Sequence, residues 1–299
     1  MVTLPRPPGA GHPVLLVLLA VVSVQFGGAL AATLLPVVGV VGSVGLRLVL
    51  AALILGVVVR PRLRGRTTMD WAVVGSFAVA LTAMNLAFYG SLARLPIGVA
   101  VTIEFLGPLA LAAALSRRWR DGVAVVAALV GVVLISEALT TPWGELDHLG
   151  ILLAATAGAC WAAYIVLSRR TGERFAGLDG IAICMALGAV VMLPAGLLTA
   201  GADLWSTDVL LRGLGIALLS SAIPYSLELL ALRRLRSGTF GVLLSLEPAA
   251  AALAGLLVLG QVLSVPQLAG MVLVVTASIV VLGRPVRRRR SPQVAGEVS

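Results

Sequence analysis

Two stretches of the sequence repeat one another and decide the fold: residues 92–112 read LARLPIGVAVTIEFLGPLALA, and residues 232–252 read LRRLRSGTFGVLLSLEPAAAA. A shift of 140 residues places residues 106–108 (Leu-Gly-Pro) over residues 246–248 (Leu-Glu-Pro). Both stretches are apolar around a central proline, which is typical of interrupted helices inside a membrane. The sequence therefore predicts two units with the same internal order of helices.

Apolar runs continue outward from these stretches along most of the chain. Of the 299 residues, 60% are hydrophobic and 12% are charged, and the mean hydropathy is +1.07. A soluble domain is about 25% charged, and a membrane-spanning helix needs about 20 mostly apolar residues. We therefore predict an all-α polytopic membrane protein of ten transmembrane helices, over residues 13–34, 38–59, 70–91, 98–116, 121–138, 147–168, 178–200, 209–230, 238–259 and 265–283.

Each predicted unit contains five of these helices, over residues 13–138 and 147–283, and a basic cytoplasmic tail follows at residues 284–299. An odd number of spans inverts the second unit relative to the first. A weaker match, at a shift of about 135 residues, places residues 24–27 over residues 159–162. Two inverted five-helix repeats are typical of secondary transporters, whose site lies near the middle of the membrane between the repeats.

The distribution of arginine predicts the orientation. The net charge is +9, and all 22 basic residues are arginine. If the loops alternate between two sides, one side receives 19 arginines and the other receives only Arg94 and Arg212. Basic loops stay in the cytoplasm, so both termini are predicted to be cytoplasmic in a multi-pass protein of the cytoplasmic (inner) membrane. The expected partner is the lipid bilayer and not nucleic acid.

An N-terminal signal peptide is the less favoured interpretation of the first apolar run, because removal of this segment would destroy the repeat.

Three carboxylates lie inside apolar runs: Glu104, Glu228 and Glu247. A charge in the middle of a bilayer costs about 2.5–3.5 kcal/mol on insertion scales, so such residues usually face a bundle interior or a wet cavity. We favour a functional role over a structural contact for Glu104 and Glu247. For Glu228 both interpretations stay open, because Arg233 and Arg234 follow closely in sequence and could pair with it.

Two prolines, Pro108 and Pro248, lie beside carboxylates at matching positions of the repeat. Proline frees a backbone carbonyl about one turn earlier in a helix. Matched interruptions in two halves of a transporter point to its binding site, although a simple kink that aids packing is the alternative.

Arg47 is the one arginine inside an apolar run, and it could hold a substrate carboxylate or pair with a buried glutamate. Snorkelling of its side chain to the membrane interface is the alternative. Further polar and aromatic side chains occur on the repeat-matched helices. These side chains are Asn85, Tyr89, Trp161, Tyr164 and Tyr225. Together with Arg47 and the three glutamates, they are predicted to line one cavity for the substrate and the coupling ion.

Motifs of enzymes and of nucleotide-driven pumps are missing. The sequence shows no nucleotide-binding loop and no Ser/His/Asp set, and its two histidines and two cysteines form no metal-ligand pattern. We therefore expect no catalytic residue, metal or cofactor, and a proton gradient as the energy source.

Several segments resemble the EamA-type drug/metabolite transporter family, and within it the threonine/homoserine exporter branch. The resemblance covers residues 13–283 and rests on residues 23–25, 45–47, 104–108, 158–164, 224–228, 239–241 and 246–248. It implies ten helices in two repeats and proton-coupled export of small amphipathic metabolites, amino acids first. Many members have Gly-Glu where this chain has Gly260-Gln261, so no role is carried over to Gln261.

The sequence thus favours an exporter of a small-molecule substrate that works by alternating access, with Glu104 or Glu247 carrying the coupling proton. The alternatives are an exporter of drug-like or toxic compounds, a passive membrane channel, and a membrane scaffold without transport. A second copy of the chain is a further candidate partner, as a homodimer.

Overall fold

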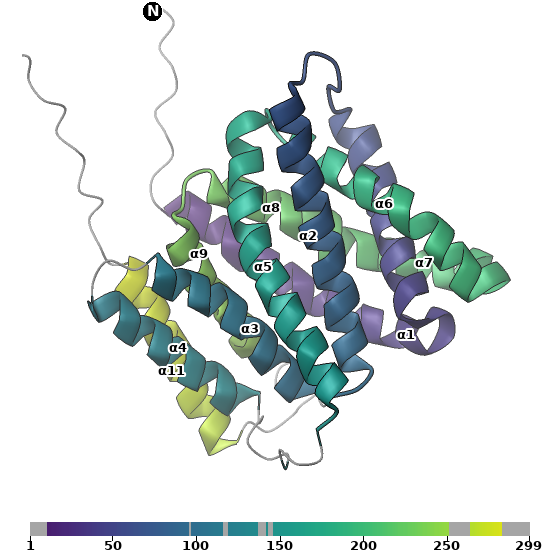
Figure 1. Ribbon diagram of the computed structural model, residues 1–299. Helices are drawn as coiled ribbons and strands as arrows, with labels where there is room; N and C mark the ends of the chain where they lie inside the picture. Colours follow the sequence, from purple (N-terminus) through teal and green to yellow (C-terminus); the bar gives the residue numbers. More distant parts are fainter. Residues whose placement is uncertain are drawn as a thin grey trace, which may run out of the picture.

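Helices form the architecture of the computed structural model, which describes residues 11–95, 97–115, 119–136, 142, 146–250 and 264–282 (Figure 1). No strand occurs within these ranges. The helices are α1 (Gly11–Val59), α2 (Thr68–Leu92), α3 (Ile97–Ala114), α4 (Trp119–Ile135), α5 (His148–Arg174), α6 (Asp179–Ala200), η3 (Gly201–Trp205), α7 (Thr207–Ala217), η4 (Leu218–Ala222), α8 (Ile223–Leu232), α9 (Ser237–Leu244) and α11 (Val265–Leu282). Residues 246–250 are also helical.

The first two predicted runs form one long element, α1, without an intervening loop. The backbone leaves the helical conformation at Gly39, which has φ 66° and ψ −177°. A positive φ of this kind is accessible to glycine because it lacks a Cβ atom. The element therefore consists of two helices that meet at a kink, and the sequence predicted the break a few residues too early, at residues 34–38.

Five helices of the described chain are long and apolar enough to cross a membrane: Thr33–Val59, Thr68–Leu92, His148–Arg174, Asp179–Trp205 and Thr207–Leu232. Shorter apolar helices cover Pro13–Gly28, Val99–Ala114, Gly122–Ile135 and Val265–Val280. Large apolar side chains also cover the outer surface, with Leu198 88% and Val58 74% exposed. This is the surface of a membrane protein with several spanning helices, and the count of ten stays a prediction. The end of the ninth predicted run and the basic tail at residues 284–299 lie outside the described residues.

The helices pack in a small number of close pairs. α1 packs against α6, α7 and α8, α2 packs along α5, and α4 packs along α11. Figure 1 shows α2 and α5 side by side in the middle of the view, with α4 and α11 paired at the lower left. α3 crosses α5 so closely that a Cβ atom added to Gly107 would lie 1.8 Å from the carbonyl oxygen of Gly158. Glycine is required here because two backbones meet.

Both ends of the α2–α5 pair carry an ion pair. Arg174 Nη1 lies 2.9 Å from Asp70 Oδ1 at one end, and Arg94 Nη1 lies 3.0 Å from Asp147 Oδ2 at the other. Asp147 also caps α5, because its carboxylate accepts a hydrogen bond from the backbone N–H of Gly150. This bond, followed by the one from Arg94, holds the pKa of Asp147 below its usual value. The two helices are therefore tied together at both ends.

One hydrogen bond joins two positions that the 140-residue shift makes equivalent, and one close backbone contact joins two glycines that are 139 residues apart. Asn85 donates a hydrogen bond to Tyr225, 140 residues away. A Cβ atom on Gly131 would lie 2.7 Å from the Gly270 carbonyl oxygen, and a Cβ atom on Gly270 would lie 2.6 Å from the Gly131 carbonyl oxygen. The shift places Gly131 over Met271, so the two glycines miss equivalence by one residue. The inverted relation between the two units and their boundaries stay a prediction.

We expect Gly131→Ala to lower the thermal stability of the purified protein, because a methyl group at this position meets the backbone of α11. Overpacking of this kind costs about 1–3 kcal/mol. Gly122→Ala on the same helix is the matched control, since nothing lies within 4 Å of its added Cβ atom. Alanine is the better helix former by about 1 kcal/mol, so this control should unfold at the same temperature or higher. Equal melting temperatures for both variants would contradict the close α4–α11 contact.

Candidate functional site

Arg47 lies on α1 in the interior of the bundle and is only 6% exposed. Its Nη1 donates to the Tyr89 hydroxyl at 3.2 Å, and its Nη2 donates to the Tyr225 hydroxyl at 2.9 Å. Its Nε donates to the Ser221 hydroxyl, and Nη2 also donates to the Ser220 carbonyl oxygen. The side chain therefore points into the protein and does not snorkel to a membrane interface.

All four acceptors around Arg47 are neutral. The ion pairs of the described residues do not include Arg47, so the pairing with a buried glutamate that the sequence left open is not seen. A buried charge without a counter-charge is costly, and an anion that reaches it gains a strong, two-pronged interaction with the guanidinium group. Arg47 is thus chemically suited to bind an anionic group of a ligand.

The acceptors on the far side of Arg47 come from a distortion in the helix that runs from α7 to α8. Residues Leu218–Ala222 form a π-helical turn, η4. Proline at position 224 has no N–H, so it cannot bond to the carbonyl of Ser220 four residues earlier. That carbonyl accepts a hydrogen bond from Arg47 instead. π-turns of this kind are frequent at functional sites.

Ser220 and Ser221 were missed in the sequence interpretation, although a signal was present. Pro224 frees the Ser220 carbonyl by the same reasoning that drew attention to Pro108 and Pro248. The turn is also contacted closely by the first half of α1: Ser23 Oγ donates to the Leu219 carbonyl oxygen at 2.7 Å.

Asn85 and Tyr89 bring α2 into the same cluster. Asn85 Nδ2 donates to the Leu81 carbonyl oxygen at 2.8 Å and to the Tyr225 hydroxyl at 3.4 Å. The Tyr225 hydroxyl therefore receives donors from both α1 and α2. Four of the predicted residues, Arg47, Asn85, Tyr89 and Tyr225, form one hydrogen-bonded cluster, and its role as a substrate cavity stays a prediction.

Glu228 lies one turn beyond Tyr225 on α8 and is 4% exposed. Its Oε2 accepts a hydrogen bond of 2.7 Å from the hydroxyl of Tyr164 on α5. The rings of Tyr164 and Tyr225 are 5.5 Å apart between centroids. Aromatic contact thus connects the Glu228–Tyr164 pair to the Arg47 cluster.

The suggested pairing of Glu228 with a following arginine is not found. Arg233 Nη2 donates to the carbonyl oxygens of Phe175 and Gly177, in the loop between α5 and α6. Burial lowers the pKa of Arg233 from its ordinary value. Arg234 forms no ion pair within the described part of the chain. Glu228 thus belongs with the interior cluster and not with the arginine loop.

Glu104 and Glu247 lie near one another, on α3 and on the helical segment 246–250. Glu104 is 7% exposed and Glu247 is half-buried. The two carboxylates are close enough to interact electrostatically, and Glu247 also interacts with Glu228. The three acids therefore share one region of the bundle, although the sequence places them on three different helices.

Pro108 and Trp161 mark the crossing of α3 with α5. Pro108 leaves the Glu104 carbonyl without its helical donor, and a Cβ atom on Gly158 would lie 2.6 Å from that oxygen. Trp161 is 8% exposed and packs edge-on against Phe105, with 4.8 Å between centroids. Trp161 is therefore buried near Glu104, and no hydrogen bond joins it to the Arg47 cluster in the described structure. Pro248 lies in the segment 246–250 beside Glu247.

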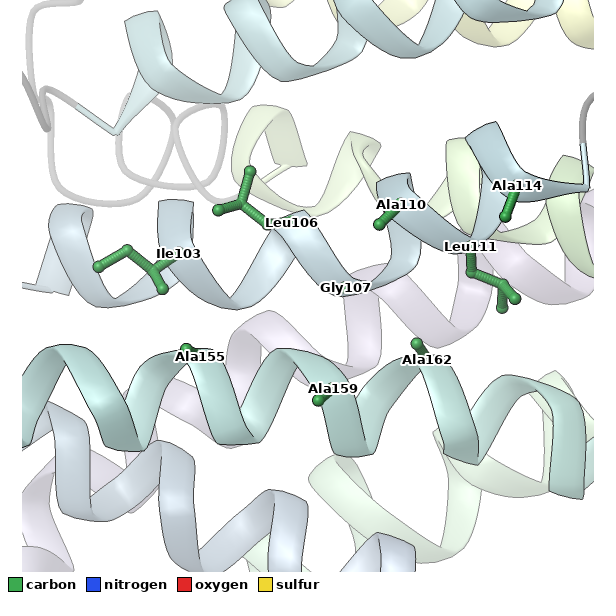
Figure 2. A pocket seen from close by; sticks show the side chains of 9 residues that line it. All are labelled: Ile103, Leu106, Gly107, Ala110, Leu111, Ala114, Ala155, Ala159 and Ala162. Carbon is green, nitrogen blue, oxygen red and sulfur yellow. The ribbon is translucent and has the colours of Figure 1, made fainter.

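A separate apolar groove of about 490 Å³ runs between α3 and α5 (Figure 2). Its walls are aliphatic side chains and backbone, and none of the predicted site residues lines it. The lining residues are Ile103, Leu106, Gly107, Ala110, Leu111, Ala114, Ala155, Ala159 and Ala162. The groove is therefore distinct from the polar cluster and offers no charged group to a ligand.

Known proteins resemble this chain over most of its length. The model of the EamA-like transporter family matches residues 148–283. The threonine/homoserine exporter RhtA of Salmonella typhimurium (strain LT2) is 40% identical over 283 residues, which cover 94% of this chain and 94% of that protein. The threonine/homoserine exporter RhtA of Escherichia coli (strain K12) is 41% identical over 268 residues, which cover 89% and 90% of the two chains.

One solved crystal structure shares the fold of this chain. The two structures superpose with a TM-score of 0.73 over 91% of this chain and 96% of the other chain, and their sequences are 18% identical. The relatives at about 40% identity extend over nearly the whole chain and are named as exporters, not enzymes. The chain therefore belongs to the EamA-like transporter family.

Proposed function

We propose that this protein is a secondary transporter that exports small amino acids similar to threonine or homoserine, or related metabolites, from the cytoplasm. The observation that carries the proposal is Arg47, a buried cation whose partners are all neutral hydroxyl or carbonyl groups. An amino acid supplies the missing anion as its carboxylate. Relatives about 40% identical, named for threonine and homoserine, support this substrate class.

In this proposal the substrate carboxylate binds the Arg47 guanidinium and displaces some of its neutral acceptors. Tyr89 and Tyr225 then have free hydroxyl groups close to the bound molecule. A phenol can donate to or accept from the hydroxyl of threonine or homoserine. A site that hydrogen-bonds a substrate hydroxyl discriminates strongly against an analogue that lacks it.

The energy source in this proposal is the proton gradient, with Glu104 or Glu247 as the coupling residue. Each can be neutralised by a proton, since burial favours the uncharged form of a carboxyl group. Neutralisation removes most of the cost of passing through a closed, dry intermediate. Alternating access between inverted halves would expose the cluster to one side of the membrane at a time.

We further propose ten spans, with both termini in the cytoplasm and the protein in the inner membrane. The 19-to-2 distribution of arginine between the loops supports this topology. A reporter fused after residue 144 should be active outside the cytoplasm, and one fused after residue 175 should be active inside. The opposite pattern, or an odd number of spans, would refute the topology.

The proposed function is tested by measuring the concentrations of threonine and homoserine in the culture medium of cells with and without the protein. We expect both concentrations to be higher for the cells that contain the protein. In vesicles preloaded with unlabelled threonine, labelled threonine added outside should accumulate transiently inside by counterflow. A passive channel does not support counterflow. Export confined to drug-like compounds would favour the second transporter interpretation.

A further inference from the structure

A second buried charge lies close to Arg47 and is not balanced by it. Glu228 is 4% exposed, and it accepts a hydrogen bond from the neutral Tyr164 hydroxyl. The ion pairs of the described residues do not include Glu228. Arg47 and Glu228 are thus a guanidinium group and a carboxyl group in one bundle interior that form no ion pair with each other.

Tyrosine side chains hold the two charges apart. Tyr225 accepts from Arg47, while Tyr164 donates to Glu228, and the two rings lie 5.5 Å apart.

A ligand with one positive and one negative group satisfies both charges at once. An α-amino acid carries an ammonium and a carboxylate group on the same carbon atom, and each forms short charge-assisted hydrogen bonds of about 2.8 Å. A cation alone would leave Arg47 without a counter-charge. Burial favours the uncharged form of a carboxyl group, and an ammonium group in contact with Glu228 favours its ionised form. A ligand with both groups therefore pairs Arg47 and also stabilises the carboxylate of Glu228, which an anion alone does not do.

We infer that Glu228 binds the ammonium group of the substrate and so restricts transport to zwitterionic amino acids, while Arg47 binds the carboxylate. The inference rests on the proposed function, because it assigns a role within the same site. It gives Glu228 a part in specificity that is distinct from the proton coupling assigned to Glu104 or Glu247.

The test is counterflow of labelled threonine into vesicles containing the purified protein, with competitors added outside. The competitors are unlabelled threonine and 3-hydroxybutanoate, which is threonine without its amino group. In the parent, 3-hydroxybutanoate should compete at least about 10-fold more weakly. In Glu228→Gln, threonine should compete on the order of 10-fold to 100-fold more weakly than in the parent, since a hydrogen bond between charged groups is lost. The preference for threonine over 3-hydroxybutanoate should then disappear.

Glu173→Gln is the matched control, because the same change is made at a side chain that is 59% exposed. It should keep the preference of the parent. Glu228→Asp retains the charge and should restore part of the preference, which a purely structural role would not predict. Glutamine can still accept from Tyr164, so the fold should be retained, and the melting temperature checks this.

An unchanged preference in Glu228→Gln would overturn the inference and leave the proposed function standing. Loss of uphill transport with an unchanged preference would also overturn it, and would assign Glu228 to coupling. Absence of threonine counterflow in the parent itself would overturn the proposed function and this assignment with it.

Discussion

Arg47→Gln is expected to abolish transport of threonine, and Arg47→Lys is expected to reduce it at least about 10-fold. The guanidinium donates in several directions at once, to Ser221, Tyr225 and the Ser220 carbonyl among others. A lysine has three N–H groups on a single atom and cannot reproduce this planar fork. Loss of one partner from a buried charged interaction costs about 2–5 kcal/mol, or more than 10-fold in affinity.

The measurement is the rate of threonine counterflow in vesicles at equal protein content. Arg169→Gln is the control, because Arg169 is 43% exposed and its ion pair within the described residues is with Glu173 on its own helix. An exposed pair of this kind is worth about 0–1 kcal/mol, so the control should transport as the parent does. Threonine counterflow at the parental rate in Arg47→Gln would show that the guanidinium does not bind the substrate.

Glu→Gln at the coupling carboxylate is expected to abolish uphill export while downhill exchange continues. Glu104 and Glu247 are the two carboxylates that the proposed mechanism offers as the proton site. Glutamine has the same shape but cannot be charged, and it therefore preserves packing and removes the proton site. Exchange of substrate for substrate needs no net proton movement and should survive in the same variant.

The two single variants, Glu104→Gln and Glu247→Gln, are compared in vesicles with an imposed pH gradient. At least one should fail to concentrate threonine against its gradient. If both concentrate it as the parent does, neither is the coupling carboxylate, and another group or ion drives export.

The positions of the helices were largely predictable, because hydropathy is a local property of the sequence. The run at residues 38–59 corresponds to the second half of α1, and the run at residues 209–230 corresponds to α7, η4 and α8. The kink at Gly39 was placed a few residues too early, because the positive φ of a glycine cannot be read from composition.

The sequence identified candidate site residues, but it did not give the hydrogen bonds between them. Arg47 and Tyr225 drew attention as polar groups in apolar runs, whereas their hydrogen bond depends on how α1 packs against α8. Glu228 and Arg233 are close in sequence, but five positions along a helix do not bring two side chains to the same face. Serines are ordinary in membrane helices, so Ser221 became notable only with the π-turn around it.

The central claim is that Arg47 binds the carboxylate of the transported amino acid. The most direct measurement is competition of threoninol, which is threonine with its carboxylate replaced by an alcohol, against labelled threonine in counterflow. We predict that threoninol competes at least about 10-fold more weakly than threonine in the parent, since a charged hydrogen bond is worth about 1.5–3 kcal/mol. In the Arg47→Lys variant, we predict a smaller difference between threonine and threoninol as competitors than in the parent. Equal competition by threonine and threoninol in the parent would contradict the account.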